Sequence, residues 1–292
     1  EGHPYAKPLT GSGTASSVNA VTRGSIAQWH EQWFRPNNAR LIVVGDTSEG
    51  EIIPRIEKLF GSWRPGDVPE RSTATVELPA KAVIYLIDKP DAVQSIIFAG
   101  ELIAPLNNPQ EAAIEAMDDV LGGQFSARLN MNLREDKGWS YGARSLIRAT
   151  AGQRPWLAYA PVQSDKTAPA LAEMHREISE FAGSNPATEE ELLRVRRTNI
   201  LSLAGRWETG PAVLKDLTSL VTNDLSDDHW NTYAQRLNSL SLDQVSAAAN
   251  TTLRPEQLTW VVIGDRARIA SELEKLGIGE IRLLDAEGNS LE

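Results

Sequence analysis

The sequence predicts an α+β protein in which a metallopeptidase-type domain is duplicated and a mostly antiparallel sheet is flanked by helices. Short apolar runs rich in β-branched residues, bounded by turn residues, predict strands in the first part of the second domain copy. Helical patterns dominate from residue 166 onward without strict alternation of strand and helix, which favours an α+β class. One helix–strand–helix segment also occurs twice.

The repeated segment is RPNNARLIVVGD at 35–46, which aligns without gaps with RPEQLTWVVIGD at 254–265, an offset of 219 residues. Each copy predicts an Arg-Pro turn followed by a buried strand, Leu41–Val44 in the first and Trp260–Ile263 in the second. Helix-like segments precede and follow both copies. Such a long match with the same flanks indicates a domain repeat.

The offset also predicts the domain boundaries. We expect residues 1–66 to be the C-terminal part of a first domain, 67–80 to be a linker, and 81–292 to be a complete second domain. The stretch 61–81 carries three prolines among Gly, Ser and Thr residues, a composition typical of an extended connector.

Within the second domain, the elements follow in a legible order. Pro109 opens a helix that Gly122 and Gly123 end. Phe125, Leu129 and Leu133, each four residues apart, predict a second helix with these side chains on one face. Strands are predicted at 81–88, 93–101, 141–150, 156–163 and 260–263. Helices are predicted at 166–182, 188–206, 211–223, 229–238, 241–252 and after 265.

Composition excludes several classes of function. The net charge of −10 argues against binding nucleic acid or anionic membranes, and no apolar run approaches the ~18 residues of a membrane span. The absence of cysteine excludes disulfides, thiolate metal sites and cysteine nucleophiles. No zinc motif of the H-E-x-x-H or H-x-x-E-H type occurs, since His30-Glu31 is followed by Phe34 where a second histidine would be needed.

The stretch GGQFSARLNMNLREDKGWSYGA at 122–143 allows two interpretations. In the first, Arg134 is a solvated charge at a helix C-terminus and Tyr141 packs at a strand edge. In the second, the Arg134 guanidinium and the Tyr141 hydroxyl are hydrogen-bond donors that suit a peptide carbonyl, and Gly138 and Gly142 let the chain turn so that the phenol faces the arginine.

The same stretch resembles the motif of the pitrilysin-like, or insulinase-type, zinc peptidases, which include the mitochondrial processing peptidase. Their pattern G-G-x-F-S-S-R-L-x-x-x-L-R-E-x-x-G-x-x-Y departs from this sequence only at Ala127. The family's other motif is matched by HPYAKPLTGSG at 3–13 followed by FRPNNARLIVVGD at 34–46. The resemblance covers residues 1–276.

The resemblance implies a zinc-dependent endopeptidase in which Arg134 and Tyr141 contact the scissile carbonyl, with Gly122, Gly123 and Phe125 beside them at the substrate. It implies zinc in the complete enzyme, bound outside this chain by a zinc-bearing N-terminal domain or a homologous subunit. We therefore expect this chain to be inactive alone. It could be part of one protease chain, a metal-free partner subunit, or a non-catalytic scaffold. The resemblance further implies a peptide substrate and export, for example to the periplasm, although a cytoplasmic location stays open.

Overall fold

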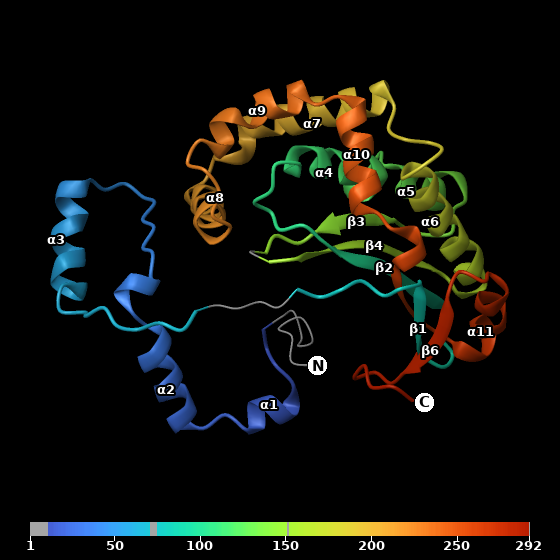
Figure 1. The fold of residues 1–292 in the computed structure, drawn as a ribbon, viewed down its shortest axis with the longest axis horizontal. Helices are drawn as coiled ribbons and strands as arrows, with labels where there is room; N and C mark the ends of the chain where they lie inside the picture. Colours follow the sequence, from blue (N-terminus) through green and yellow to red (C-terminus); the bar gives the residue numbers. More distant parts are fainter. Residues whose placement is uncertain (1–10, 71–74, 151, 292) are drawn as a thin grey trace. The chain divides into compact units, whose positions relative to one another are not determined.

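The computed structural model describes residues 11–70, 75–150 and 152–291, and the chain forms two compact units (Figure 1). One unit holds the described residues up to Thr75 together with Gly205–Val221, and the other holds Val76–Ala204 and the residues from Thr222 onward. Most of the HPYAKPLTGSG motif, at 3–10, and part of the predicted linker, at 71–74, lie outside the described residues. Each unit is described by itself below.

The first unit is built from helices with well-formed N-termini. Its helices are α1 (Ala15–Asn19), α2 (Arg23–Trp33), α3 (Glu49–Phe60) and most of α8 (Gly210–Thr222). Thr14, Thr22 and Ser48 begin α1 to α3 with capping boxes, in which side chain and backbone satisfy each other's free hydrogen-bonding groups. None of the residues of α1, α2 and α3 is buried, so their stability does not come from a core within this unit.

The predicted strand Leu41–Val44 is wrong, because these residues form no strand. The side chains of Leu41 and Val43 are 61% and 46% exposed, whereas their repeat equivalents, Trp260 and Val262, are fully buried. The cause is the lack of a neighbour: the equivalent strand is hydrogen-bonded on both sides, and among the described residues no segment pairs with 41–44. The flanking features are alike in both copies, including the 3-10 turns at Pro36–Asn38 and Pro255–Gln257.

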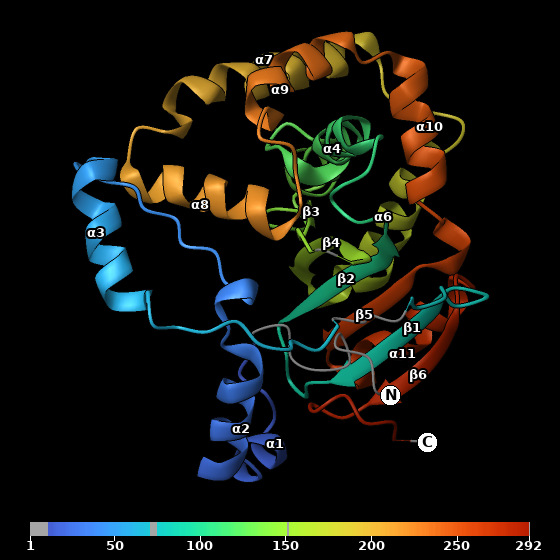
Figure 2. The ribbon, with the colours of Figure 1, turned by 60° about the vertical axis from the view of Figure 1, so that its left-hand side comes forward.

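The second unit contains a six-stranded sheet of order β3-β4-β2-β5-β1-β6 (Figures 1 and 2). The strands are β1 (Val83–Asp88), β2 (Gln94–Ile103), β3 (Arg144–Ile147), β4 (Arg154–Gln163), β5 (Thr259–Gly264) and β6 (Glu280–Leu284). The pairs from β3 to β5 are antiparallel, and β1 runs parallel to both β5 and β6. The predicted α+β class, a sheet flanked by helices, is confirmed, and β6 was not predicted.

Helices cover one face of this sheet. They include α4 (Glu111–Asp118), α6 (Thr167–Phe181), α10 (Leu242–Thr252) and α11 (Arg266–Lys275), while α7 (Glu189–Arg206) and α9 (His229–Ser239) lie farther from the strands (Figure 2). Along β4, Trp156, Ala158 and Ala160 are fully buried and alternate with half-exposed residues, as expected of a sheet packed on one side.

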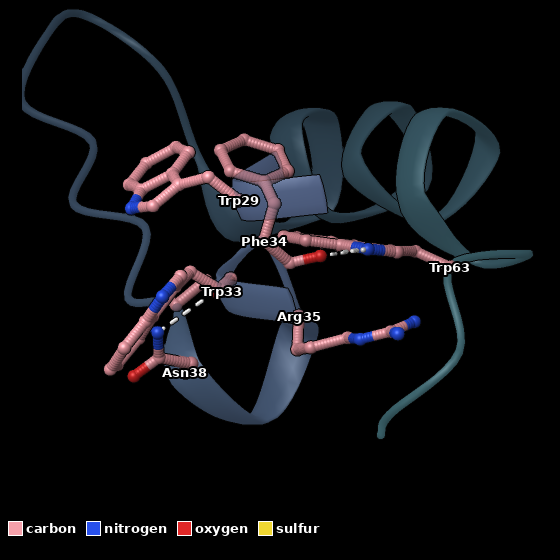
Figure 3. Close-up of a pocket in the computed structure, with 7 residues that line it drawn as sticks. Trp29, Trp33, Phe34, Arg35, Asn38 and Trp63 are labelled. Carbon is pink, nitrogen blue, oxygen red and sulfur yellow. Dashed lines mark hydrogen bonds between the residues drawn. The ribbon is translucent and has the colours of Figure 1, made fainter. Parts of the chain in front are cut away.

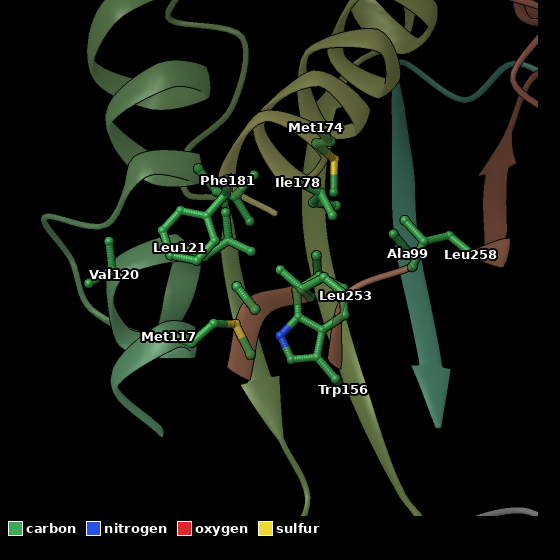
Figure 4. Close-up of a cluster of buried hydrophobic side chains, with 14 of the residues drawn as sticks. Ala99, Met117, Val120, Leu121, Trp156, Met174, Ile178, Phe181, Leu253 and Leu258 are labelled. Carbon is green, nitrogen blue, oxygen red and sulfur yellow. The ribbon is translucent and has the colours of Figure 1, made fainter. Parts of the chain in front are cut away.

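The core of the second unit lies between the sheet and these helices. Trp156 from β4 and Met117 and Leu121 from the α4 region point into it, and Met174 and Phe181 of α6 close it (Figure 4). Burial of such large apolar side chains is the main stabilising term of a domain, about 1.5–3 kcal/mol for each. No helix in the described part of the chain combines the length and apolar character needed to cross a membrane.

Candidate active site

A cavity of about 360 Å³ in the second unit is lined by all five residues for which the resemblance implies a place at the substrate. Its lining includes Gly122, Gly123, Phe125, Arg134 and Tyr141. Gly142 also lines it, as do Gln124, Asn130, Ala143 and Arg144, which no sequence pattern marked. The structure therefore brings the two ends of the motif to one concave surface, although they are separated by a helix and a turn.

The helix that leads into the cavity ends in an unusual way. After α4, residues Asp119–Gly123 form a π-helical turn, and Gln124 is extended. A side chain at Gly122 would place its Cβ 2.4 Å from the backbone nitrogen of Ser145, so only glycine lets this turn pack directly on β3. A second π-helical turn, Met131–Asp136, follows the short helix α5 (Arg128–Asn130). Such turns are frequent at functional sites.

Phe125 does not take the place in the core that its spacing predicted. Leu129 and Leu133 are fully buried, but Phe125 precedes the helix and its side chain is 66% exposed. Its ring instead lies 4.8 Å from the guanidinium carbon of Arg134, a cation–π contact. The regular spacing of the three residues was misleading because the helix begins only at Arg128, so Phe125 faces the cavity.

The turn from Arg134 to Tyr141 is fixed by backbone hydrogen bonds. Gly138 has φ of +64°, and its N–H donates to the Arg134 carbonyl at 3.1 Å. The Ser140 hydroxyl lies 2.6 Å from the Pro161 carbonyl of β4 and so ties the segment to the sheet. Of the two glycines that were expected to permit a sharp turn, only Gly138 has a positive φ; Gly142 does not.

Asn130 connects the two walls of the cavity. This buried side chain donates to the Phe125 carbonyl at 2.7 Å, and its Oδ1 accepts from the Ala143 N–H at 3.2 Å. One amide therefore holds the segment that carries Phe125 against the segment that carries Tyr141. Because both partners are backbone groups, the link fixes chain positions rather than side-chain rotamers.

The two candidate donors are accessible. Tyr141 is 87% exposed, and its hydroxyl forms no hydrogen bond with any described residue. The Arg134 guanidinium is partly exposed and has an ion pair at 3.3 Å with Glu135, which is equally exposed, so the pair is weak and easily exchanged. A permanently charged planar donor and a free phenolic hydroxyl in one cavity can together hydrogen-bond a carbonyl oxygen that gains negative charge.

Two carboxylates lie behind Gly123 but do not line the cavity. Burial raises the pKa of Asp118 to about 6, and this carboxylate accepts a hydrogen bond from Trp156 Nε1 at 2.8 Å. Burial also raises the pKa of Asp119, which accepts from Asn199 Nδ2 at 2.7 Å. The buried Trp156 and the half-buried Asn199 engage these two carboxylates, which therefore serve the packing of the α4 region and leave the cavity lining without an acid.

Another cavity of the second unit, of about 210 Å³, has a lining that includes Glu111, Glu115, His229, Tyr233 and Arg236. There Arg236 donates to the His229 carbonyl at 2.9 Å, whereas the ion pair of Arg134 is exposed.

No group of three or more His, Cys, Asp or Glu side chains among the described residues is placed to hold a metal ion. The first unit has an aromatic cavity of about 490 Å³, where Trp29, Trp33, Phe34 and Trp63 gather and Trp63 Nε1 donates to the Phe34 carbonyl at 3.3 Å (Figure 3). This cavity is apolar apart from Arg35 and Asn38 and carries no pair of donors like Arg134 and Tyr141.

Comparison with known proteins identifies the family. Residues 20–199 match the model of the peptidase M16 inactive domain. This match covers more than half of the chain. The chain belongs to the peptidase M16 inactive domain family. The predicted relationship to insulinase-type zinc peptidases is therefore confirmed.

Relatives of this M16 inactive domain are named zinc proteases. An uncharacterized zinc protease of Mycobacterium leprae is 24% identical over 262 residues, which are 86% of this chain and 56% of that protein. One of Rickettsia felis is 25% identical over 203 residues, which are 68% of this chain and 47% of that protein. The chain thus spans about half the length of the curated relatives it matches.

The fold is also shared with a solved structure, the peptidase M16 inactive domain from Pseudomonas fluorescens. The two superpose with a TM-score of 0.76 at 22% identity, over 87% of this chain and 60% of that one. At this identity the likeness shows the fold. Family and fold together establish this chain as the M16 inactive domain of a zinc-protease-like protein.

Proposed function

We propose that this chain is the substrate-binding half of a zinc-dependent endopeptidase, in which Arg134 and Tyr141 contact the scissile peptide carbonyl. The single observation that carries the proposal is that Arg134 and Tyr141 line one cavity, each with its donor groups accessible. A scaffold has no chemical need for such a pair, whereas hydrolysis of an amide needs donors where the oxyanion forms.

Each residue has a distinct task in this proposal. The Arg134 guanidinium stays charged at any pH near neutrality and offers a planar fork of N–H donors to the substrate carbonyl. The Tyr141 hydroxyl donates to the oxygen on which negative charge develops during attack. Gly122, Gly123 and Phe125 border the same cavity and shape the space that the substrate backbone occupies.

We place the zinc site outside this chain, in keeping with a sequence that contains neither zinc motif of such peptidases. There it would supply an activated water molecule for attack on the peptide bond. The zinc-bearing part is an N-terminal domain of the same protein or a homologous subunit.

We further propose that the zinc-bearing part covers the apolar surface of the first unit. Its exposed Leu41 and Val43 are the repeat equivalents of Trp260 and Val262, which are buried in a strand paired on both edges. Two strands contributed by the zinc-bearing part would satisfy the unpaired backbone of residues 41–44 and bury these side chains.

The test compares zinc content and peptide turnover in three samples: the complete protein, residues 1–292 alone, and residues 1–292 mixed with a zinc-bearing homologous subunit. We expect zinc and turnover only where the zinc-bearing part is present. One tightly bound zinc per chain in residues 1–292 would contradict the proposal. A complete protein that holds zinc but cleaves no peptide would favour the non-catalytic scaffold instead. Cell fractionation tests the accompanying proposal of export to the periplasm.

A further inference from the structure

Arg144 is a second cation in the candidate active site, and nothing in the motif marks it. It is the first residue of β3, lies opposite Tyr159 of β4, and lines the same cavity as Arg134 and Tyr141. Its side chain is exposed, and its guanidinium forms no hydrogen bond or ion pair with any described residue. Among the residues around the cavity, its charge is therefore uncompensated.

An aromatic ring lies beside this guanidinium and does not neutralise its charge. Its carbon lies 5.7 Å from the centroid of the Tyr159 ring, and the Tyr159 ring is 5.1 Å from that of Phe98 on the next strand. An arginine stacked on an aromatic ring keeps all its N–H donors free at the edge of the plane. Arg144 thus lies beside the Tyr159 ring and is still open to a ligand.

The charge balance of the cavity is opposite to that of the chain. The chain carries a net charge of −10, yet the cavity lining contains two guanidinium groups and no carboxylate. Arg134 has a weak ion pair with Glu135, whereas Arg144 has none among the described residues. An unpaired arginine beside a substrate cavity favours a carboxylate ligand, with which it forms two parallel charge-assisted hydrogen bonds.

We propose that Arg144 forms a substrate subsite that selects an acidic side chain close to the scissile bond. The inference rests on the proposed function, because Arg134 and Tyr141 define where the scissile bond lies. Two residues separate Tyr141 from Arg144, so their Cα atoms lie at most about 11 Å apart. A bound extended peptide advances about 3.3 Å per residue, so the selected side chain lies within about three residues of the bond that is cleaved.

The experiment uses the complete zinc-bearing protein and a set of fluorescent peptides with Glu, Gln or Lys at each of three positions on either side of the cleaved bond. Both Kd, from fluorescence anisotropy, and kcat/KM are measured. At one position the wild type should favour Glu over Gln by about 10-fold in both quantities, as expected for a charge-assisted hydrogen bond. Arg144→Gln should bring the Glu-to-Gln ratio to about 1. Arg144→Glu should make the peptide with Lys at this position the preferred one.

Arg148→Gln is the matched control, because Arg148 follows the same strand and is exposed but does not line the cavity. Arg148→Gln should keep the wild-type preference for Glu. Arg144→Lys should retain part of the preference that Arg144→Gln loses.

A Glu-to-Gln ratio near 1 at every position in the wild type, or a ratio that Arg144→Gln leaves unchanged, would overturn the subsite. This failure is distinct from failure of the proposed function, which would show as unaltered turnover in Arg134→Ala. If the wild type cleaves no peptide, the proposed function has failed, and the Kd ratios then show only whether Arg144 binds an acidic side chain.

Discussion

The guanidinium of Arg134 rests on the ring of Phe125, with 4.8 Å between the guanidinium carbon and the ring centroid. Phe125 leaves the apolar stripe that its spacing predicted and stands at the cavity instead, two-thirds exposed. An exposed aromatic ring under a cation fixes the direction of the cation's N–H donors at little cost in conformational freedom. In our account this contact orients Arg134 toward the substrate carbonyl.

Replacing Phe125 by leucine should therefore affect activity more than stability. We expect Phe125→Leu to lower kcat/KM of the complete enzyme several-fold, since a cation–π contact at an exposed site is worth about 0.5–1 kcal/mol. Its midpoint of thermal unfolding should stay close to that of the wild type. Leu129→Ala is the contrasting variant, because that side chain is fully buried and its loss should cost about 2–5 kcal/mol of stability. A Phe125→Leu protein with full activity would argue against the orienting role.

Asn130 should be needed to keep the two walls of the cavity together. Asn130→Ala leaves the Phe125 carbonyl and the Ala143 N–H without their partner, and the loss at the buried Ala143 N–H costs about 1–3 kcal/mol. Denaturant unfolding should show this loss, and hydrogen exchange of the Ala143 amide should become faster. Asn108→Ala is a control of the same type, because Asn108 also donates to a backbone carbonyl, that of Pro105, and accepts from a backbone N–H, that of Gln110, but does not line the cavity. If Ala143 exchange were equally slow in Asn130→Ala, the link would not be what holds this wall.

Gly122 should tolerate no side chain. The Cβ of an alanine would lie 2.4 Å from the Ser145 nitrogen and 2.5 Å from its Oγ, so the π-helical turn and β3 would have to separate. We expect Gly122→Ala to destabilise the protein by about 1–3 kcal/mol, measured by chemical denaturation. At Gly183 an added Cβ meets only the Ser179 carbonyl at 3.4 Å, so Gly183→Ala should be nearly neutral. Equal stabilities for the two variants would show that the close approach is not required.

Glu101 should make stability depend on pH. Burial raises the pKa of this β2 carboxyl from 4.5 to about 7, even though the Arg254 N–H donates to it at 3.0 Å. Between pH 4.5 and 7 the folded state binds this proton more tightly than the unfolded state does, so the free energy of unfolding falls as pH rises through this range. Glu101→Gln removes the effect and should raise stability at pH 8 by up to about 3 kcal/mol, with little change at pH 4.5.

Denaturation curves at the two pH values measure this difference directly. Glu274→Gln, at an exposed position on α11, should leave the pH dependence as in the wild type. A Glu101→Gln variant that is equally or less stable at pH 8 would show that the Arg254 contacts outweigh the cost of burial.

Most of the fold was predictable because local patterns and tertiary context agree. The strands β1, β2, β4 and β5 are apolar runs between turn residues, and each finds a neighbour in the sheet. Residues 41–44 have the same local pattern as β5 but no partner strand among the described residues. The apolar pattern alone therefore predicted a strand that does not form. The edge strand β6 was missed because Glu280 and Arg282 interrupt its apolar residues.

The candidate site divides in the same way. Arg134 and Tyr141 could be predicted from a motif, because their spacing and the neighbouring glycines lie within one continuous stretch of sequence. Arg144 and Asn130 could not be found by such a motif, because their significance depends on strand register and on a contact across 13 residues. Phe125 was identified at the site by resemblance but placed on the wrong surface by periodicity. Local spacing does not reveal where a helix begins.

The most direct test of the central claim is steady-state kinetics of Arg134→Ala and Tyr141→Phe in the complete zinc-bearing protein. Arg268→Ala and Tyr85→Phe are matched controls, since neither residue lines the cavity. We predict that each site variant lowers kcat about 10²-fold, the scale of one lost oxyanion donor, while zinc content and folding stay unchanged. Wild-type kcat and kcat/KM in both site variants would contradict the account.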